Sequence, residues 1–121
     1  MATKPPSKAK RIGAVAEVSA DVVISATTTA AAVNDSNSSA ISGCLMYGVA
    51  IESASVGTAD VRLIVKDDGT EKFRFLLTDT ANQMAQSVYS FPAPIAINGA
   101  LTIAHSENAT KATYKVFYLP Y

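Results

Sequence analysis

The sequence contains no tryptophan, one cysteine and one histidine among its 121 residues. Cys44 alone cannot close an internal disulfide, and no cluster of Cys and His residues exists that could satisfy a zinc site. Any histidine-based general base would have to be His105, and a catalytic triad cannot be recognised from one member. These absences argue against an enzyme, and they predict neither a metal nor a cofactor.

Long hydrophobic runs are also missing. No segment approaches the roughly 18 apolar residues of a membrane span, and residues 14–18 are too short and too interrupted by Glu17 to form the apolar part of a signal peptide. Ten Lys and Arg residues balance ten Asp and Glu residues, so the net charge is zero. A neutral chain has no global field to steer it toward nucleic acid or an anionic membrane, and we predict neither as a partner.

The charges are unevenly distributed along the chain. Residues 1–11 carry Lys4, Lys8, Lys10 and Arg11 and no acid, which leaves six bases against ten acids in the remainder, a net charge of −4. This segment also holds two prolines and almost nothing apolar, so it cannot offset the entropy of ordering itself. We predict a flexible basic arm, which is either a solvated tail or a tether that becomes ordered against an acidic neighbouring subunit.

The remainder, residues 12–121, is long enough for one compact domain and too short for two. Apolar and polar residues alternate with period two in several segments that are separated by turn signals, and β-branched residues are abundant. The alternating segments are residues 12–18, 22–26, 41–52, 61–66, 72–77, 88–91, 101–104 and 112–118. We therefore predict an all-β sandwich or jelly roll of about eight antiparallel strands.

The clearest predicted strand covers residues 41–52. Its larger apolar residues carry odd numbers and would share the core-facing side: Ile41, Leu45, Tyr47, Val49 and Ile51. Cys44 would lie on the other face, as a small packed residue and not as a nucleophile, because nothing nearby in the sequence would lower its pKa.

Several turns and irregular segments are predicted from local chemistry. Asp67-Asp68-Gly69 predicts a hairpin turn, and its spacing does not fit a calcium-binding loop. Asn98-Gly99 predicts a second hairpin turn, of type I′. The short polar side chains of residues 34–39 predict a surface loop, and Pro92 with Pro94 predicts an edge or irregular crossing.

Three further features bear on the surface. The hairpin that turns at Asp67-Asp68-Gly69 would carry four cations on its outer face, and neighbouring acids would partly offset their charge. The four cations are Arg62, Lys66, Lys72 and Arg74. His105 precedes a polar segment and is predicted to be an exposed loop histidine. Tyr118 and Tyr121, near the C-terminus, would either close the sandwich or anchor a partner contact.

From Ile41 to Tyr118 the strands and turns follow a recurrent order. The segments that carry it are Leu45-Met46-Tyr47-Gly48-Val49-Ala50-Ile51, Ser53-Ala54-Ser55-Val56-Gly57-Thr58-Ala59, Val65-Lys66-Asp67-Asp68-Gly69, Ser90-Phe91-Pro92-Ala93-Pro94-Ile95, Asn98-Gly99-Ala100-Leu101-Thr102-Ile103 and Tyr114-Lys115-Val116-Phe117-Tyr118. In this order the chain resembles small virion structural proteins of bacteriophages. The resemblance implies a jelly-roll module that decorates heads, tails or fibres and has no enzyme activity. It implies no functional residues and does not include the basic arm.

The expected function is that of a capsid decoration or cement protein, a homo-oligomer such as a trimer bound to the major capsid protein or to other virion proteins. The protein would be synthesised in the host cytoplasm and reside on the capsid surface of the virion. The candidate partner-binding residues are Lys4, Lys8, Lys10, Arg11, Tyr118 and Tyr121. The alternative is a glycan-binding or host-surface-binding module of a phage fibre or tail, although sugar platforms favour exposed aromatic residues and the chain has no Trp.

Overall fold

The computed structural model describes residues 16–25, 29–56, 61–77, 88–107 and 110–121, and within these ranges the chain forms strands and no helix. The strands are β1 (Glu17–Val18), β2 (Val22–Ser25), β3 (Ala31–Ala32), β4 (Ser42–Val56), β5 (Arg62–Asp67), β6 (Thr70–Leu76), β7 (Val88–His105) and β8 (Thr110–Pro120). All of their pairings are antiparallel. The prediction of an all-β fold with about eight antiparallel strands is confirmed.

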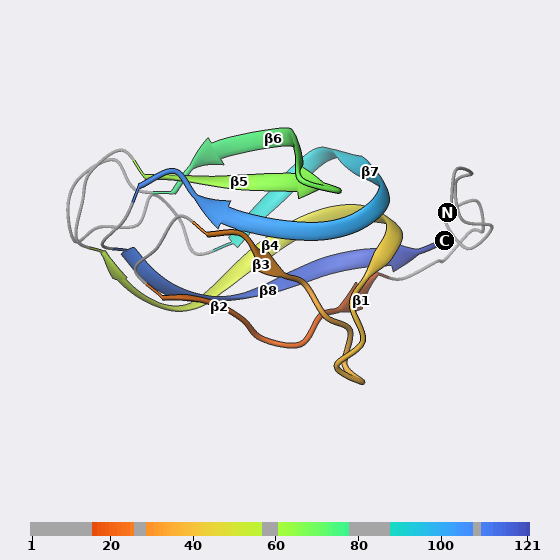
Figure 1. The fold of residues 1–121 in the computed structure, drawn as a ribbon, viewed down its shortest axis with the longest axis horizontal. Helices are drawn as coiled ribbons and strands as arrows, with labels where there is room; N and C mark the ends of the chain where they lie inside the picture. Colours follow the sequence, from red (N-terminus) through yellow and green to blue (C-terminus); the bar gives the residue numbers. More distant parts are fainter. Residues whose placement is uncertain (1–15, 26–28, 57–60, 78–87, 108–109) are drawn as a thin grey trace.

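The long strand β7 joins two layers of sheet. The strand order is β1-β8-β4-β7-β5-β6, with β2 also paired to β8 and β3 also paired to β7. The first part of β7 pairs with β4, whereas its last five residues pair with β5. Figure 1 shows β7 curving round so that β5 and β6 lie over β4 and β8, which makes the fold a sandwich.

The core lies between the two layers and follows the period-two alternation. On β8 the inward residues Ala112, Tyr114, Val116 and Tyr118 are all at most 3% exposed. They meet the buried residues Val61, Leu63 and Val65, which come from the opposite layer and have no exposed surface. These alternating faces are placed as the sequence predicts, because successive side chains of a strand point to opposite sides of its sheet.

The predicted core face of β4 is wrong over its first half. Cys44 and Met46 have no exposed surface, whereas Leu45 and Tyr47 are only half-buried. The cause is a β-bulge. Met46 pairs with Tyr118 and Gly48 pairs with the adjacent Phe117, so Tyr47 has no partner in β8. One extra residue moves the side chains that follow it to the opposite face. The bulge also requires glycine at position 48, where a Cβ atom would collide with the carbonyl oxygen of Tyr89.

The predicted hairpin turn at Asn98-Gly99 is also wrong. Both residues lie inside β7, at the bend where this strand passes from one layer to the other, and neither has a positive φ angle. The bend is held by the hairpin turn between β5 and β6. Asn98 N–H and Gly99 N–H donate to the Asp67 carboxylate over 3.0 and 2.7 Å, and Ala100 N–H donates to Asp68 Oδ1 over 3.0 Å.

The other two turn predictions are confirmed. Asp68 and Gly69 connect β5 to β6 with φ angles of 49° and 82°, which are the two positive values that a type I′ turn requires. Residues 34–39 form a loop that projects below the sandwich in the view of Figure 1. Asp35 Oδ1 stabilises this loop by accepting hydrogen bonds from the N–H groups of Asn37 and Ser39, each 2.9 Å long.

The prolines of β7 mark an irregular segment, as predicted. Ser90 pairs with Gly48 and Ile95 pairs with Met46, so the four residues between Ser90 and Ile95 have no ladder partners in β4. Pro92 and Pro94 are exposed within this interruption. Since proline has no N–H to donate, it is tolerated where the ladder is broken.

Some predicted features are not placed by the structure. The basic arm at residues 1–11 and the start of the predicted strand at residues 12–18 lie outside the described residues, as does the segment at residues 78–87. Val18, which was expected on an apolar face with residues 14 and 16, is 44% exposed. The short strand β3 was not predicted.

Candidate protein-contact surfaces

Four aromatic rings form a continuous cluster between β6 and the first part of β7. We call this set, Phe73, Phe75, Tyr89 and Phe91, the aromatic cluster. The ring centroids of Phe75 and Tyr89 are 4.4 Å apart, and those of Phe73 and Phe91 are 5.5 Å apart at an interplanar angle of 62°. Phe75 lies 6.0 Å from both Phe73 and Phe91. These tilted and edge-on arrangements are the ones that aromatic pairs prefer.

The aromatic cluster runs from the core to the surface. Tyr89 is 7% exposed, and its hydroxyl donates to the carbonyl of Leu77 over 3.2 Å. Phe75 and Phe91 are half-buried, and Phe73 is 41% exposed. Phe73 is exposed because β6 is the last strand of the sheet order and pairs only with β5. The buried end of the cluster therefore fixes the position of a ring at the surface.

Exposed prolines continue this apolar surface. Residues 92–94, which follow Phe91 directly, are all exposed. Proline loses little conformational entropy when a partner binds, because its φ angle is already fixed. Aromatic residues, phenylalanine among them, are enriched in protein–protein interfaces relative to the rest of the surface. Phe73 and Phe91 were not among the candidate contact residues predicted from the sequence, although the segment Ser90–Ile95 was singled out for its aromatic and proline residues.

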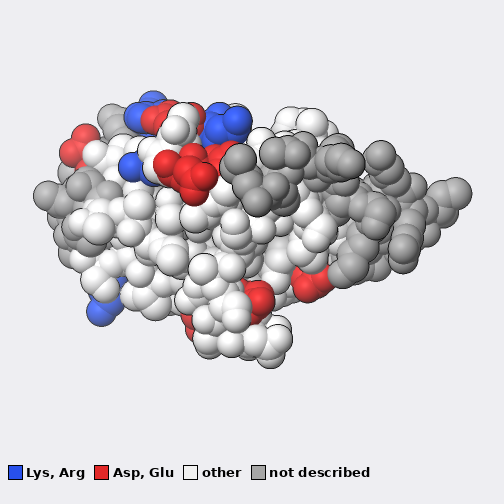
Figure 2. Space-filling model, turned by 45° about the vertical axis from the view of Figure 1, so that its right-hand side comes forward, with Lys and Arg blue, Asp and Glu red and all other residues white. Residues whose placement is uncertain are grey.

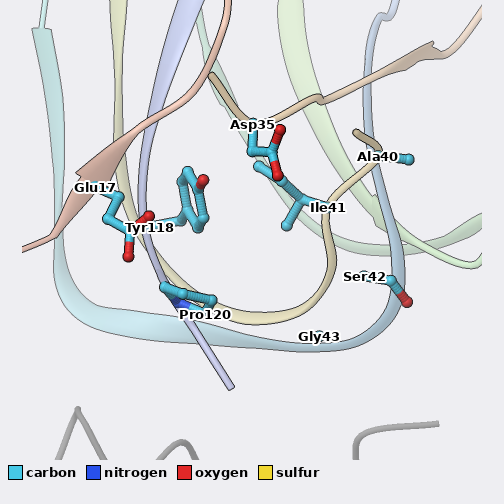
Figure 3. A pocket seen from close by; sticks show the side chains of 8 residues that line it. All are labelled: Glu17, Asp35, Ala40, Ile41, Ser42, Gly43, Tyr118 and Pro120. Carbon is cyan, nitrogen blue, oxygen red and sulfur yellow. The ribbon is translucent and has the colours of Figure 1, made fainter. Parts of the chain in front are cut away.

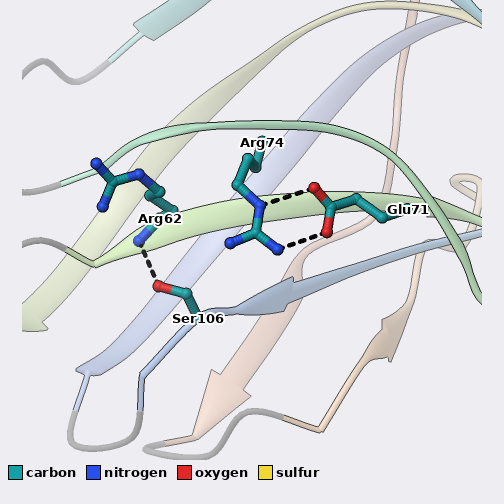
Figure 4. A network of polar contacts seen from close by, with 4 residues as sticks. All are labelled: Arg62, Glu71, Arg74 and Ser106. Carbon is teal, nitrogen blue, oxygen red and sulfur yellow. Dashed lines mark hydrogen bonds and ion pairs between the residues drawn. The ribbon is translucent and has the colours of Figure 1, made fainter.

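The outer face of the β5–β6 hairpin is charged, with both signs interleaved (Figure 2). Lys72 and Arg74 are exposed, while Arg62 and Lys66 are half-buried. Arg74 donates two hydrogen bonds to the Glu71 carboxylate, from Nε over 2.7 Å and from a terminal nitrogen over 2.5 Å (Figure 4). These bonds lower the pKa of Glu71 below its ordinary value. The pair is exposed and therefore adds little to stability.

Figure 4 also shows how this hairpin is joined to the end of β7. The backbone N–H of Arg62 donates to Ser106 Oγ over 2.8 Å, and the N–H of Ser106 donates to the carbonyl of Arg62 over 2.9 Å. The two residues therefore extend the ladder between β5 and β7 beyond the last strand pair. The charged face is held on a rigid support.

A small pocket of about 220 Å³ lies where β1, the segment from Asp35 to the start of β4 and the end of β8 meet. Its side-chain lining includes Glu17, Asp35, Ile41, Ser42, Tyr118 and Pro120 (Figure 3). Burial, followed by the negative charges of Glu17 and Asp35, raises the pKa of Tyr118. The pocket is therefore acidic and holds a protonated phenol at neutral pH.

The two C-terminal tyrosines that the sequence predicted as candidate contacts differ in their burial. Tyr118 is 3% exposed and closes the core between the layers. Tyr121 is half-buried, and its backbone N–H donates to the carbonyl of Gly43 over 3.2 Å. The other four candidates, Lys4, Lys8, Lys10 and Arg11, lie outside the described residues.

His105 is not the exposed loop residue that was predicted. It is the last residue of β7, is 1% exposed, and its Nε2 lies 2.6 Å from the hydroxyl oxygen of Tyr114. The sequence could not show this, because β7 continues one residue further than the apolar alternation and so carries the histidine into the core. Burial also raises the pKa of the Tyr114 hydroxyl. The side chains of His105 and Tyr114 therefore form a buried polar pair inside the sandwich.

Cys44 is a packed core residue, as predicted, although it lies on the face opposite to the one expected.

Within the described ranges, no group of three or more His, Cys, Asp or Glu side chains is arranged to hold a metal ion. No helix long and apolar enough to cross a membrane occurs in the part of the chain that the structure describes. Comparisons with protein-family models, with curated proteins and with solved structures find no match to the chain.

Proposed function

We propose that the chain is a non-enzymatic structural protein of a virus particle that decorates the capsid and stabilises the shell through protein–protein contacts. The observation that carries this proposal is the aromatic cluster, whose buried end holds Phe73 at the surface next to the exposed prolines of β7. A rigid apolar surface of this kind suits binding to another protein. The resemblance of the strand order to small phage virion proteins supplies the virion context.

The proposed partners are the major capsid protein and neighbouring copies of the chain, arranged as a homo-oligomer such as a trimer on the capsid surface. Each copy would add interface area between adjoining capsomers without altering any covalent bond. A partner that binds only the intact shell stabilises it by mass action, and many weak contacts add together when they are repeated over a lattice. The expected consequence is a higher barrier to rupture of the shell.

The proposal is tested by adding the purified chain to particles that were assembled without it. Wild-type protein should co-sediment with the particles and raise the temperature at which they release nucleic acid. Phe73→Ala should weaken binding about tenfold or more, because it removes the exposed ring of the aromatic cluster. Val23→Ala is the matched control, since Val23 is also an exposed apolar residue, 50% exposed on β2, and lies outside this cluster.

Equal binding by the wild type and by Phe73→Ala would show that the aromatic cluster has no part in attachment. Two outcomes would reject the decoration of the capsid itself. One is a wild type that neither co-sediments with the particles nor raises their release temperature. The other is selective binding of the wild type to a glycan array with no binding to particles, which would replace a decoration protein with a host-surface-binding module.

A further inference from the structure

The only Asn-Gly pair of the sequence lies at the bend of β7, where this strand passes from one layer to the other (Figure 1). Asparagine followed by glycine is the pair most prone to deamidation, because glycine has no Cβ atom to hinder ring closure. The Gly99 nitrogen loses its proton and attacks Cγ of Asn98, a five-membered succinimide closes, and ammonia leaves. Water then opens the ring at either carbonyl and yields aspartate or isoaspartate. The reaction therefore requires only the chain itself and water.

The turn between β5 and β6 holds the nitrogen that would attack. Gly99 N–H donates to Asp67 Oδ1 over 2.7 Å, and Asn98 N–H donates to Asp67 Oδ2 over 3.0 Å. Hydrogen bonds to a carboxylate are among the strong ones in proteins. The negative charge of Asp67 also disfavours the anion that must form at the Gly99 nitrogen. Both effects slow the first step of deamidation.

The surroundings of the bend also oppose closure of the ring. Gly99 is buried, and the Asp68 carboxylate occupies the space where a Cβ atom of residue 99 would lie. The Tyr121 hydroxyl donates to Asn98 Oδ1 over 3.5 Å, and the residues on either side of the Asn-Gly pair are held in the ladder with β4. Ring closure must turn the Gly99 nitrogen toward the Asn98 side chain, so these contacts must open first.

We infer that Asn98 is a guarded modification site, at which deamidation proceeds only when the turn between β5 and β6 releases the bend of β7. Parts of a folded protein open at a lower free energy than the whole, so such a release does not require global unfolding. Asp67 is the residue that sets how often it occurs. The inference does not depend on the proposed function, because it concerns only bonds within one chain.

The products of the reaction fit the bend less well than asparagine does. Aspartate at position 98 would place a second carboxylate near that of Asp67, and like charges at short distance repel each other. Isoaspartate would add one atom to the backbone and change the spacing of β7 at the point where it crosses between the layers. Molecules that have opened would therefore accumulate an irreversible change, which limits the lifetime of the folded chain.

Peptide mass spectrometry of the full chain measures the rate at which Asn98 is converted. The purified protein is incubated at mildly alkaline pH, in native buffer and in concentrated urea. In native buffer the conversion of Asn98 should be at least about a hundredfold slower than in urea, because the bend is then closed in most molecules. Asn37, which is exposed in the loop at residues 34–39, provides an internal reference in the same samples.

Two variants distinguish release of the bend from unfolding of the whole chain. Asp67→Ala should accelerate the conversion of Asn98 in native buffer about tenfold or more, because it removes both hydrogen bonds to the bend. Asp67→Asn, which keeps one acceptor oxygen, should give an intermediate rate. Val22→Ala is the matched control, since it removes buried volume on β2 and leaves the bend intact. It should leave the rate at Asn98 close to that of the wild type.

Circular dichroism verifies that the variants remain folded, and the rate at Asn37 should be the same in all of them. A folded wild type that converts Asn98 as fast as the chain in urea would overturn the inference. So would an unchanged or lower rate in both Asp67 variants, and a lower rate would identify the carboxylate as a base that promotes the reaction. Equal acceleration by Asp67→Ala and Val22→Ala would assign the reaction to global unfolding and would also overturn it.

Discussion

Burial makes the single thiol of the chain inert. Cys44 has no exposed surface, and desolvation, followed by the negative charge of Asp67, raises the pKa of its thiol from 9.0 to about 12. A thiol that stays protonated at neutral pH is a poor nucleophile. The role of Cys44 is therefore to fill the core beside the bulge of β4.

This pKa shift predicts a loss of stability at alkaline pH. Between pH 9 and pH 12 the unfolded chain loses the Cys44 proton and the folded chain keeps it, so the free energy of unfolding falls as pH rises. From pH 8 to pH 10.5 the loss from this group should be about 2 kcal/mol. Urea unfolding of the wild type and of Cys44→Ala, in the presence of a reductant, measures it. The variant should lose less stability over this range, and an equal loss in both proteins would contradict the assignment.

Regular strands are predictable from the sequence and their interruptions are not. The alternation on β2, β5 and β8 identifies the buried face because each residue of these strands takes one place in the ladder. On β4 the extra residue, Tyr47, inverts the alternation, and its position is set by pairing with β7 and β8. Contacts between distant segments decide where a bulge lies, so a local pattern cannot show it.

The bend of β7 is a second case in which a distant contact decides the local structure. Asn98-Gly99 has the composition of a hairpin turn, yet the Asp67 carboxylate, 31 and 32 residues away, binds both of its N–H groups. A Cβ atom at position 99 would meet the Asp68 carboxylate, so glycine leaves room for this side chain beside the bend. Gly99 suggested a hairpin turn in the sequence. In the structure it instead lets the β5–β6 hairpin turn approach the bend of β7 closely. The aromatic cluster escaped prediction for a similar reason, because the exposure of Phe73 depends on β6 being the last strand.

Asp67 should therefore stabilise the passage of β7 between the layers. Asp67→Ala removes both charge-assisted hydrogen bonds to the bend and should lower the free energy of unfolding by about 2–3 kcal/mol. Glu107→Ala, an exposed acid, should change it by less than about 0.5 kcal/mol. Urea denaturation followed by circular dichroism compares the two variants. Equal stabilities would show that the bend does not depend on Asp67.

The described residues combine a sandwich with two kinds of surface feature that would suit contact with another protein. The aromatic cluster and the prolines of β7 offer an apolar surface, and the pocket at the end of β8 offers an acidic one. The composition predicted the uneven distribution of charge, because the count of acids and bases needs no fold. The composition could not bring Glu17, Asp35 and Tyr118 together, since these residues meet only when β1 and the loop at residues 34–39 pack near the end of β8.

The number of copies of the chain in purified particles tests the proposed role most directly. Quantitative mass spectrometry against a labelled standard, with the major capsid protein counted in the same sample, gives this ratio. A protein that decorates a symmetric shell should be present in copies on the order of hundreds, in a simple ratio to the major capsid protein. A handful of copies per particle, or none, would contradict the proposal.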